Sequence, residues 1–255
     1  MKLPITPQQA TIVNRLEHLN SLLLANAHAK ASYILQKNRY RYLVHLSSII
    51  SSQPMQPVLD FGSGYPFIPF VLRELGIHCI PYEPYLSDDI EKVSSTLGLA
   101  SIKSLSTIME VRLSGIILND ILEHIPYLLE TCQHIRNLSY QSNAVLSLST
   151  PNVFRMRMWL SMILRRHHLP TSIDTILTSS AADSFHIREY SSSNLRSIAR
   201  ALEFTRDISV RYENANLFSE DFPNVFARTR VAFGHKLITA RHSFREHLYL
   251  LAKKS

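Results

Sequence analysis

The chain has 255 residues, of which 45% are hydrophobic and 18% are charged. This balance is typical of a folded globular protein and excludes a mainly disordered one, and the length suits one large α/β domain with a small appendage. No apolar run reaches the roughly 18 residues that a membrane span needs, and the first residues lack the apolar core of a signal peptide. We therefore expect a soluble, cytoplasmic protein with no membrane span.

The net charge of +7 is unevenly distributed. Residues 1–150 carry 11 basic and 11 acidic side chains, whereas residues 151–255 carry 16 basic and 9 acidic ones. A basic face suits an anionic partner, although a solvated basic surface is the commoner case. The two cysteines, Cys79 and Cys132, have no metal-binding or redox spacing and are interpreted as buried apolar residues.

Helical patterns fill the first 50 residues. Thr6 precedes Pro7 and Gln9, which predicts a capped helix start, and Ile12, Leu16, Leu19 and Leu23 continue at helical spacing. A second helix is predicted at about 29–50. We expect residues 1–52 to form an N-terminal helical segment that caps the substrate site, and residues 53–255 to form the main domain, with a helical insertion at about 153–185.

From Pro57 onward, short apolar runs alternate with helical patterns, which predicts a parallel sheet covered by helices on both faces. The predicted strands are 58–61, 77–82, 101–105, 115–119, 144–149, 208–212 and 247–252. The predicted helices are 66–75, 88–97, 127–138, 153–166, 192–202 and 225–240. The helix at 153–166 is basic and rich in methionine, so it fits either a lid over the substrate or an amphipathic helix packed on the domain.

A glycine-rich turn, Gly62-Ser63-Gly64, follows the first predicted strand and precedes a helix. Glycines let the backbone approach a ligand closely, and a helix N-terminus offers free N–H groups. The third glycine of a dinucleotide-binding turn is missing, because Tyr65, Pro66 and Phe67 follow Gly64. The turn is therefore a candidate cofactor site, but NAD is a poor match.

Two acidic residues flank this turn. Asp60 lies two residues before Gly62 and fits the ammonium group of a bound amino acid better than a pyrophosphate. Glu83 ends the second predicted strand, where a carboxylate can accept the ribose hydroxyls of an adenosine group. A turn-capping Asp60 and a solvated Glu83 are the alternative interpretations. Together, the two acids favour S-adenosylmethionine.

Several motifs in the correct order resemble class I S-adenosylmethionine-dependent methyltransferases. The motifs are Val58–Gly64, Ile117–Ile125 with Asp120-Ile121-Leu122-Glu123-His124, Ser147–Asn152, and His186-Ile187-Arg188-Glu189-Tyr190. They are most similar to the branch of ubiquinone-type O-methyltransferases, also called methyltransferase domain 23. The resemblance implies a Rossmann-like, seven-stranded sheet whose last strand pairs antiparallel at one edge. The implied cofactor-binding residues are Asp60, Phe61, Gly62, Ser63, Gly64, Glu83, Asn119 and Asp120.

The chain also departs from this family pattern. Pro66 replaces a glycine of the first motif, and Ser139–Asn143 replaces the usual turn before the strand at 144–149. Residues 104–107 lack the acid that often meets the adenine.

Methyl transfer from a sulfonium requires an aligned nucleophile and, for an oxygen acceptor, a base that removes a proton. Glu123, His124 and His186 are the candidate catalytic bases. We expect O-methylation of a small-molecule acceptor, and the oligomeric state does not follow from the sequence.

Two other functions remain open. Asp120, Glu123, His124 and His186 carry carboxylate and imidazole groups that could share a divalent metal ion, as in RNA 2′-O-methylation. In the structural alternative, Glu123 stabilises its loop and His124 packs against the sheet. The third function is a non-catalytic S-adenosylmethionine-binding module that regulates a partner.

Overall fold

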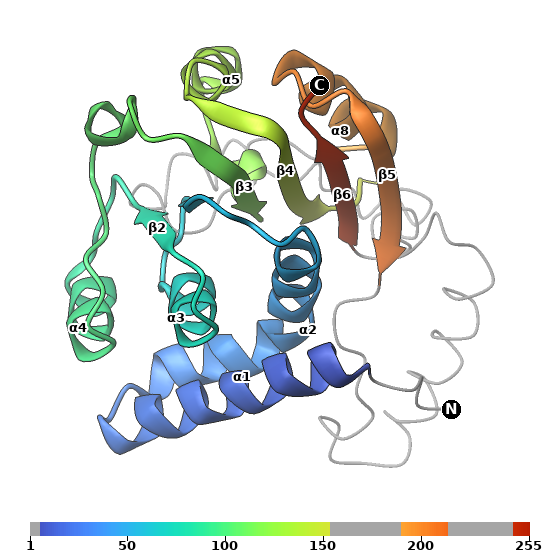
Figure 1. Cartoon of the computed structure of the whole chain (residues 1–255). Coiled ribbons are helices and arrows are strands. Elements are labelled where there is room, and N and C mark those ends of the chain that lie inside the picture. Colours follow the sequence, from blue (N-terminus) through green and yellow to red (C-terminus); the bar gives the residue numbers. More distant parts are fainter. Residues whose placement is uncertain (1–5, 154–189, 214–246) are drawn as a thin grey trace, which may run out of the picture.

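The computed structural model describes residues 6–153, 190–213 and 247–255, which form a sheet between layers of helices (Figure 1). Apart from residue 153, the predicted helices at 153–166 and 225–240 and the insertion at about 153–185 lie outside these ranges. The helices are α1 (Pro7–Ala25), α2 (Ala29–Ser51), α3 (Phe67–Glu74), α4 (Asp88–Thr96), α5 (Leu128–Arg136) and α8 (Ser192–Ala201), with 3-10 turns η1 (Leu105–Ile108) and η2 (Leu122–His124). The strands are β1 (Val58–Phe61), β2 (Cys79–Tyr82), β3 (Leu113–Asn119), β4 (Tyr140–Pro151), β5 (Arg206–Glu213) and β6 (His247–Lys253).

The sheet has the strand order β2-β1-β3-β4-β6-β5. Strands β1 to β4 are parallel to one another, whereas β6 pairs antiparallel with both β4 and β5. The predicted antiparallel pairing of the last strand is confirmed, but its predicted edge position is wrong. Strand β5 takes the edge, because polar and apolar residues alternate along it from Asp207 onward, which suits a half-solvated strand, whereas β6 is largely apolar and buried.

The sheet of the described residues has six strands, so the expectation of seven is wrong. The predicted strand at 101–105 is reduced to a single bridge between Ile102 and Tyr82. Ile102 lies between polar residues, and the Ser104 side chain accepts a hydrogen bond from the Ser106 N–H (3.3 Å) at the start of η1. This local bond favours a turn over a continued ladder, so the backbone leaves the sheet.

The N-terminal helices form part of the main core. At the start of α1, the Thr6 side chain accepts from the Gln9 N–H and the Gln9 side chain accepts from the Thr6 N–H, which confirms the predicted cap. The apolar side of α1 packs on α2 and α3, and these two helices contact the sheet (Figure 1). Four predicted core residues of α1 are buried: Ile12, Leu16, Leu19 and Leu23.

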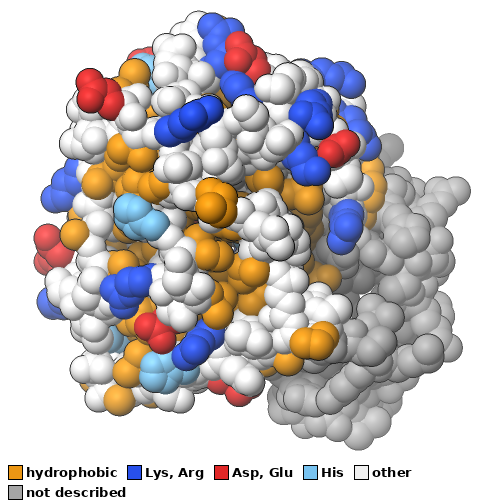
Figure 2. Space-filling model, in the orientation of Figure 1, with side chains coloured by type: hydrophobic (Ala, Val, Ile, Leu, Met, Phe, Trp, Pro, Cys, Tyr) orange, Lys and Arg blue, Asp and Glu red, His pale blue; other side chains and the backbone are white. Residues whose placement is uncertain are grey.

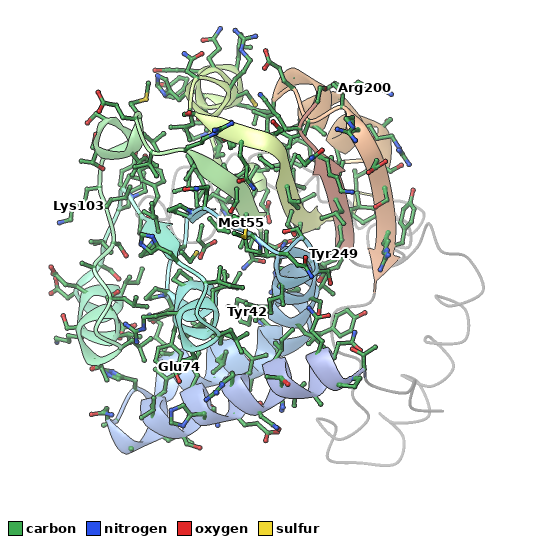
Figure 3. All side chains as sticks on the ribbon, in the orientation of Figure 1. Tyr42, Met55, Glu74, Lys103, Arg200 and Tyr249 are labelled. Atoms are coloured by element: carbon green, nitrogen blue, oxygen red, sulfur yellow. The ribbon has the colours of Figure 1, made fainter. Side chains whose placement is uncertain are left out.

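Successive side chains along the strands point into two different hydrophobic cores, one on each face of the sheet. Val58, Ile117 and Val145 face the layer that contains α1, α2 and α3. Their strand neighbours face α5 and α8 on the other side, as Leu59 and Ile116 do. Side chains fill both layers (Figure 3), so the predicted covering of both sheet faces is confirmed. Met55, on the loop that enters β1, is exposed on the near face in this view.

Lysine and arginine side chains gather over α5, α8 and β5 on the face shown in Figure 2. Part of this charge is neutralised locally, since Lys253 pairs with Asp207 and Lys254 pairs with Glu203, both at 2.9 Å. The free thiols of Cys79 and Cys132 are buried, as predicted. Within the described ranges, no helix combines the length and the apolar character needed to cross a bilayer.

Candidate functional site

The glycine-rich turn lies at the carboxyl end of β1. Gly62 and Gly64 have φ angles of +72° and +50°, which L side chains adopt only with strain. The backbone N–H groups of Gly62 and Ser63 donate to the Tyr82 carbonyl oxygen at 2.8 and 3.0 Å. The turn is therefore held against the end of β2, and α3 begins directly after Pro66.

Asp60 and Glu83 are brought together at this turn. Asp60 is only 2% exposed, and burial, reinforced by the negative charge of Glu83, raises the pKa of Asp60 to about 8. One Glu83 oxygen accepts from the Gly64 N–H (2.9 Å), and the other accepts from the Tyr85 N–H (3.1 Å). Because a carboxylate has about four acceptor positions, Glu83 retains capacity for two more donors.

Phe61, Ser63 and Gly64, in and beside the turn, have different surroundings. Phe61 is buried and packs on Tyr82, with 4.7 Å between the ring centroids. The Ser63 Oγ is buried without a hydrogen-bond partner among the described residues. A Cβ built on Gly64 would meet no atom within 4 Å, so space is open beside this residue. A buried hydroxyl without a partner is unusual, because most buried polar groups are hydrogen-bonded.

Asn119 and Asp120 lie at the carboxyl end of β3, next to the turn. Asp120 has a φ of +49°, in the left-handed region that Asp and Asn tolerate better than most residues. The side chain of the following residue, Ile121, lies where a Cβ on Gly62 would be, at 2.6 Å. The predicted cofactor residues of β1, β2 and β3 therefore share one edge of the sheet.

Sequence reasoning missed a polar group that α2 brings to this edge. Arg41 forms an ion pair with Asp120, and both side chains are largely buried, at 16% and 15% exposed. His247, at the start of β6, lies 3.4 Å from the same Asp120 oxygen. His45 is fully buried between Ser147 and Ser149 of β4. Arg41 and His45 lie one helical turn apart in the sequence, but only the packing of α2 on β4 shows that His45 faces the two serines.

The predicted catalytic residues are located as follows. Glu123 is 1% exposed, and its Oε2 accepts a hydrogen bond from the Thr150 hydroxyl at 3.0 Å. His124 is partly exposed at the end of η2. His186 lies outside the described residues. Asp120, Glu123 and His124 thus follow β3 closely, whereas their relation to His186 is a prediction only.

The proposed metal ligands differ in their surroundings. Asp120 is paired with Arg41, and Glu123 is bonded to Thr150. Across the three described ranges, histidine, cysteine, aspartate and glutamate side chains form no group of three or more that could hold a metal ion. The metal hypothesis therefore depends on His186.

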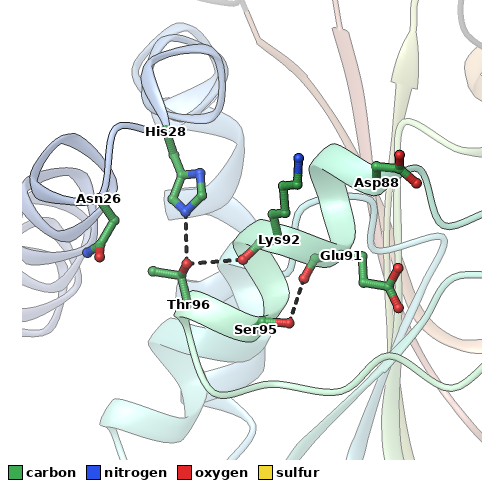
Figure 4. A pocket seen from close by; sticks show the side chains of 7 residues that line it. All are labelled: Asn26, His28, Asp88, Glu91, Lys92, Ser95 and Thr96. Carbon is green, nitrogen blue, oxygen red and sulfur yellow. Dashed lines mark hydrogen bonds between the residues drawn. The ribbon is translucent and has the colours of Figure 1, made fainter.

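A surface hollow of about 440 Å³ lies between the α1–α2 turn and α4 (Figure 4). None of the predicted cofactor residues lines it. Three of its polar side chains form local hydrogen bonds, since His28 pairs with the Thr96 hydroxyl at 2.8 Å and Ser95 donates to the Glu91 carbonyl oxygen at 2.9 Å. The hollow is thus separate from the glycine-rich turn.

The overall structure is similar to solved methyltransferases. A structure of a SAM-dependent methyltransferase from Archaeoglobus fulgidus matches with a TM-score of 0.55 and 20% identity, covering 87% of this chain and 99% of the other. A putative sarcosine dimethylglycine methyltransferase from Galdieria sulphuraria matches with a TM-score of 0.52 and 16% identity, covering 87% and 88%. The fold is that of the S-adenosylmethionine-dependent methyltransferases. No protein-family model matches the chain, and no curated protein matches it in sequence.

A third solved structure with the methyltransferase fold contains bound molecules. It is the 1,6-didemethyltoxoflavin-N1-methyltransferase of Burkholderia thailandensis with bound S-adenosylhomocysteine, with a TM-score of 0.51 and 12% identity, covering 100% of this chain and 93% of the other. In open α/β folds, ligands bind beyond the carboxyl ends of the parallel strands. Here that edge carries Gly62–Gly64, Glu83 and Asn119.

Proposed function

We propose that this chain binds S-adenosylmethionine and transfers its methyl group to an oxygen atom of a small-molecule acceptor. The observation that carries the proposal is the buried Asp60 beside the Gly62–Gly64 turn, with Glu83 bonded to the same turn. The methyltransferase fold of the solved structures supports the same cofactor. The ubiquinone-type branch remains part of the proposal, because its motifs are present in order.

The residues at the turn fit this cofactor chemically. Asp60 suits the cationic ammonium of the methionine group, and Glu83 suits the two ribose hydroxyls. The Ser63 hydroxyl has no hydrogen-bond partner among the described residues, and the space beside the Gly64 backbone is open. When bound, the cofactor would supply a methyl group already activated by a positive sulfur.

The residues of the chain must then orient the acceptor and remove its proton. Glu123 is buried and bonded to Thr150, which favours its role in stabilising the loop. His124 is partly exposed on the same turn, so it is the better-placed base among the described candidates. His186 remains a second candidate base. The segment 1–52 is proposed to border the acceptor site, since Arg41 reaches Asp120.

Titration calorimetry tests cofactor binding and its pH dependence together. Asp60 must ionise to pair with the ammonium, but the raised pKa of about 8 keeps it protonated at neutral pH. Binding should therefore release a proton, and affinity should increase from about pH 6 to about pH 8. The heat of binding should change with the ionisation enthalpy of the buffer.

Asp60→Asn provides the matching variant, because it keeps the size of the side chain and removes the charge. For this variant we expect a dissociation constant for S-adenosylmethionine that is at least tenfold larger, and no proton release on binding. Asp207→Asn, which removes a surface carboxylate paired with Lys253, is the control and should bind as the wild type does. Absence of binding to the folded wild-type protein would refute the proposed function.

An acceptor screen distinguishes the enzymatic alternatives. Transfer to a phenolic or hydroxyl-bearing small molecule that survives a chelator would support the proposed reaction. Activity on an RNA 3′ end that a chelator abolishes, together with steeply salt-dependent RNA binding, would favour the metal-assisted alternative. Cofactor binding without turnover on any acceptor would favour a regulatory module.

A further inference from the structure

Helix α2 carries a buried histidine that the proposed reaction does not use. His45 Nδ1 lies 2.7 Å from the Ser147 hydroxyl, and its Nε2 lies 3.1 Å from the Ser149 hydroxyl. Both serines are on the side of β4 that faces α2, whereas Leu146 and Leu148 face the opposite core. A polar contact inside an otherwise apolar interface must be fully hydrogen-bonded to be tolerated.

The hydrogen bonds form a directed chain toward Asp120. Burial and the positive charge of Arg41 lower the pKa of His45 to about 3, so its ring is neutral and has one donor and one acceptor nitrogen. The Ser149 hydroxyl lies 2.7 Å from Asp120 Oδ1, which can only accept. Ser149 therefore donates its single proton toward the Asp120 and Asn119 side-chain oxygens, which share it, and accepts from His45 Nε2–H, while Ser147 donates to Nδ1.

Ser149 differs from Ser147 in what it contacts beyond His45. The Ser149 oxygen also accepts from the Asp120 N–H at 3.2 Å, and it lies 3.1 Å from the Asn119 Oδ1. Arg41, one turn before His45 on the same helix, pairs with the other Asp120 oxygen. Two side chains of α2 thus restrain the turn that places Ile121 against Gly62.

We propose that His45 is a positioning residue, which acts through Ser149 to hold Asn119 and Asp120 in the geometry that the cofactor requires. The N-terminal helix would then set the affinity of a site to which His45 itself contributes no direct contact. This inference rests on the proposed function, because it concerns binding of S-adenosylmethionine at the Gly62–Gly64 edge.

A matched pair of serine variants tests the proposal. Ser147→Ala and Ser149→Ala each remove one hydroxyl from the same strand and one bond to His45, so both should lower the unfolding free energy. Only Ser149→Ala should also weaken S-adenosylmethionine binding, by about five- to tenfold, measured by calorimetry at a temperature where both variants are folded. Equal dissociation constants for the two variants would overturn the proposal.

Amide replacements of His45 provide a rescue experiment. Glutamine can place an N–H near the position of Nε2, whereas asparagine can place an acceptor near that of Nδ1. His45→Gln should therefore retain cofactor affinity within about threefold, and His45→Asn should lose about as much affinity as Ser149→Ala. An equal loss in both would indicate general disruption and contradict the positioning role. Failure of the wild-type protein to bind would instead refute the proposed function.

Discussion

Gly62 and Gly64 have similar backbone conformations but different surroundings, which makes them a matched pair. Both have positive φ angles, so alanine strains either position. Only at Gly62 would the added Cβ meet Ile121, at 2.6 Å. Gly62→Ala must therefore displace the segment after β3 as well as strain the turn.

We expect Gly64→Ala to lower the unfolding free energy by about 1 kcal/mol, and Gly62→Ala to lower it by about 2–4 kcal/mol. Urea unfolding monitored by circular dichroism measures both. The cofactor dissociation constant of Gly62→Ala should also increase more than that of Gly64→Ala. Similar effects at the two positions would mean that Ile121 gives way without consequence for the site.

For single residues, the sequence alone predicted those site residues whose partners lie close to them along the chain. Asp60 and Gly62–Gly64 belong to one short motif, and Glu83 follows at the end of the next strand. His45 and Ser147 are 102 residues apart, and only the packing of α2 on β4 brings them together. Pattern reasoning cannot find such a pair, because nothing local requires a histidine opposite a serine.

At the scale of elements, helix α2 has a structural as well as a proposed functional role. Ile49 is fully buried, and it lies near Gly115 of β3, where a Cβ would be 3.5 Å from the isoleucine side chain. Tyr33, on the same helix, is 65% exposed. The helix therefore offers a buried and an exposed residue for comparison.

Ile49→Ala should lower the unfolding free energy by about 2–5 kcal/mol, because it leaves a cavity between α2 and the sheet. Tyr33→Ala should change it by less than about 0.5 kcal/mol. Denaturant titration with a helix signal at 222 nm provides the measurement. If α2 were a detachable cap, Ile49→Ala would produce a separate early transition and leave the main one unchanged.

Periodicity predicted the long helices and the apolar strands well, since α1, α2 and β1 lie close to their predicted limits. It failed where the pattern was weak. Residues 101–105 contain mainly polar side chains, and a local serine bond turned the backbone into η1. The position of β5 at the edge could not be derived from either strand alone, because it depends on how β6 pairs on both sides.

At the scale of the whole molecule, two buried groups couple stability to pH in opposite directions. His45, with a pKa lowered to about 3, is neutral when folded but holds a proton below about pH 6.5 when unfolded. The unfolding free energy therefore decreases as pH falls from 6.5 toward 3. Asp60, with a pKa raised to about 8, holds a proton when folded that the unfolded chain releases above about pH 4. That contribution to stability decreases as pH rises from 4 to 8.

The two effects oppose each other between about pH 4 and 6.5, and only that of Asp60 acts between about 6.5 and 8. Each contributes at most about 1.4 kcal/mol per pH unit. Without cofactor, the unfolding free energy of Asp60→Asn should therefore rise by about 2 kcal/mol relative to that of the wild type between pH 6.5 and 8. The unfolding free energy of His45→Gln should decrease from about pH 4 upward, because only the effect of Asp60 remains in this variant. Urea unfolding at about pH 4.5, 6.5 and 8 measures the differences from wild type. A constant difference for Asp60→Asn across this range would show that Asp60 ionises normally in the folded protein, and it would remove the expected proton release on cofactor binding.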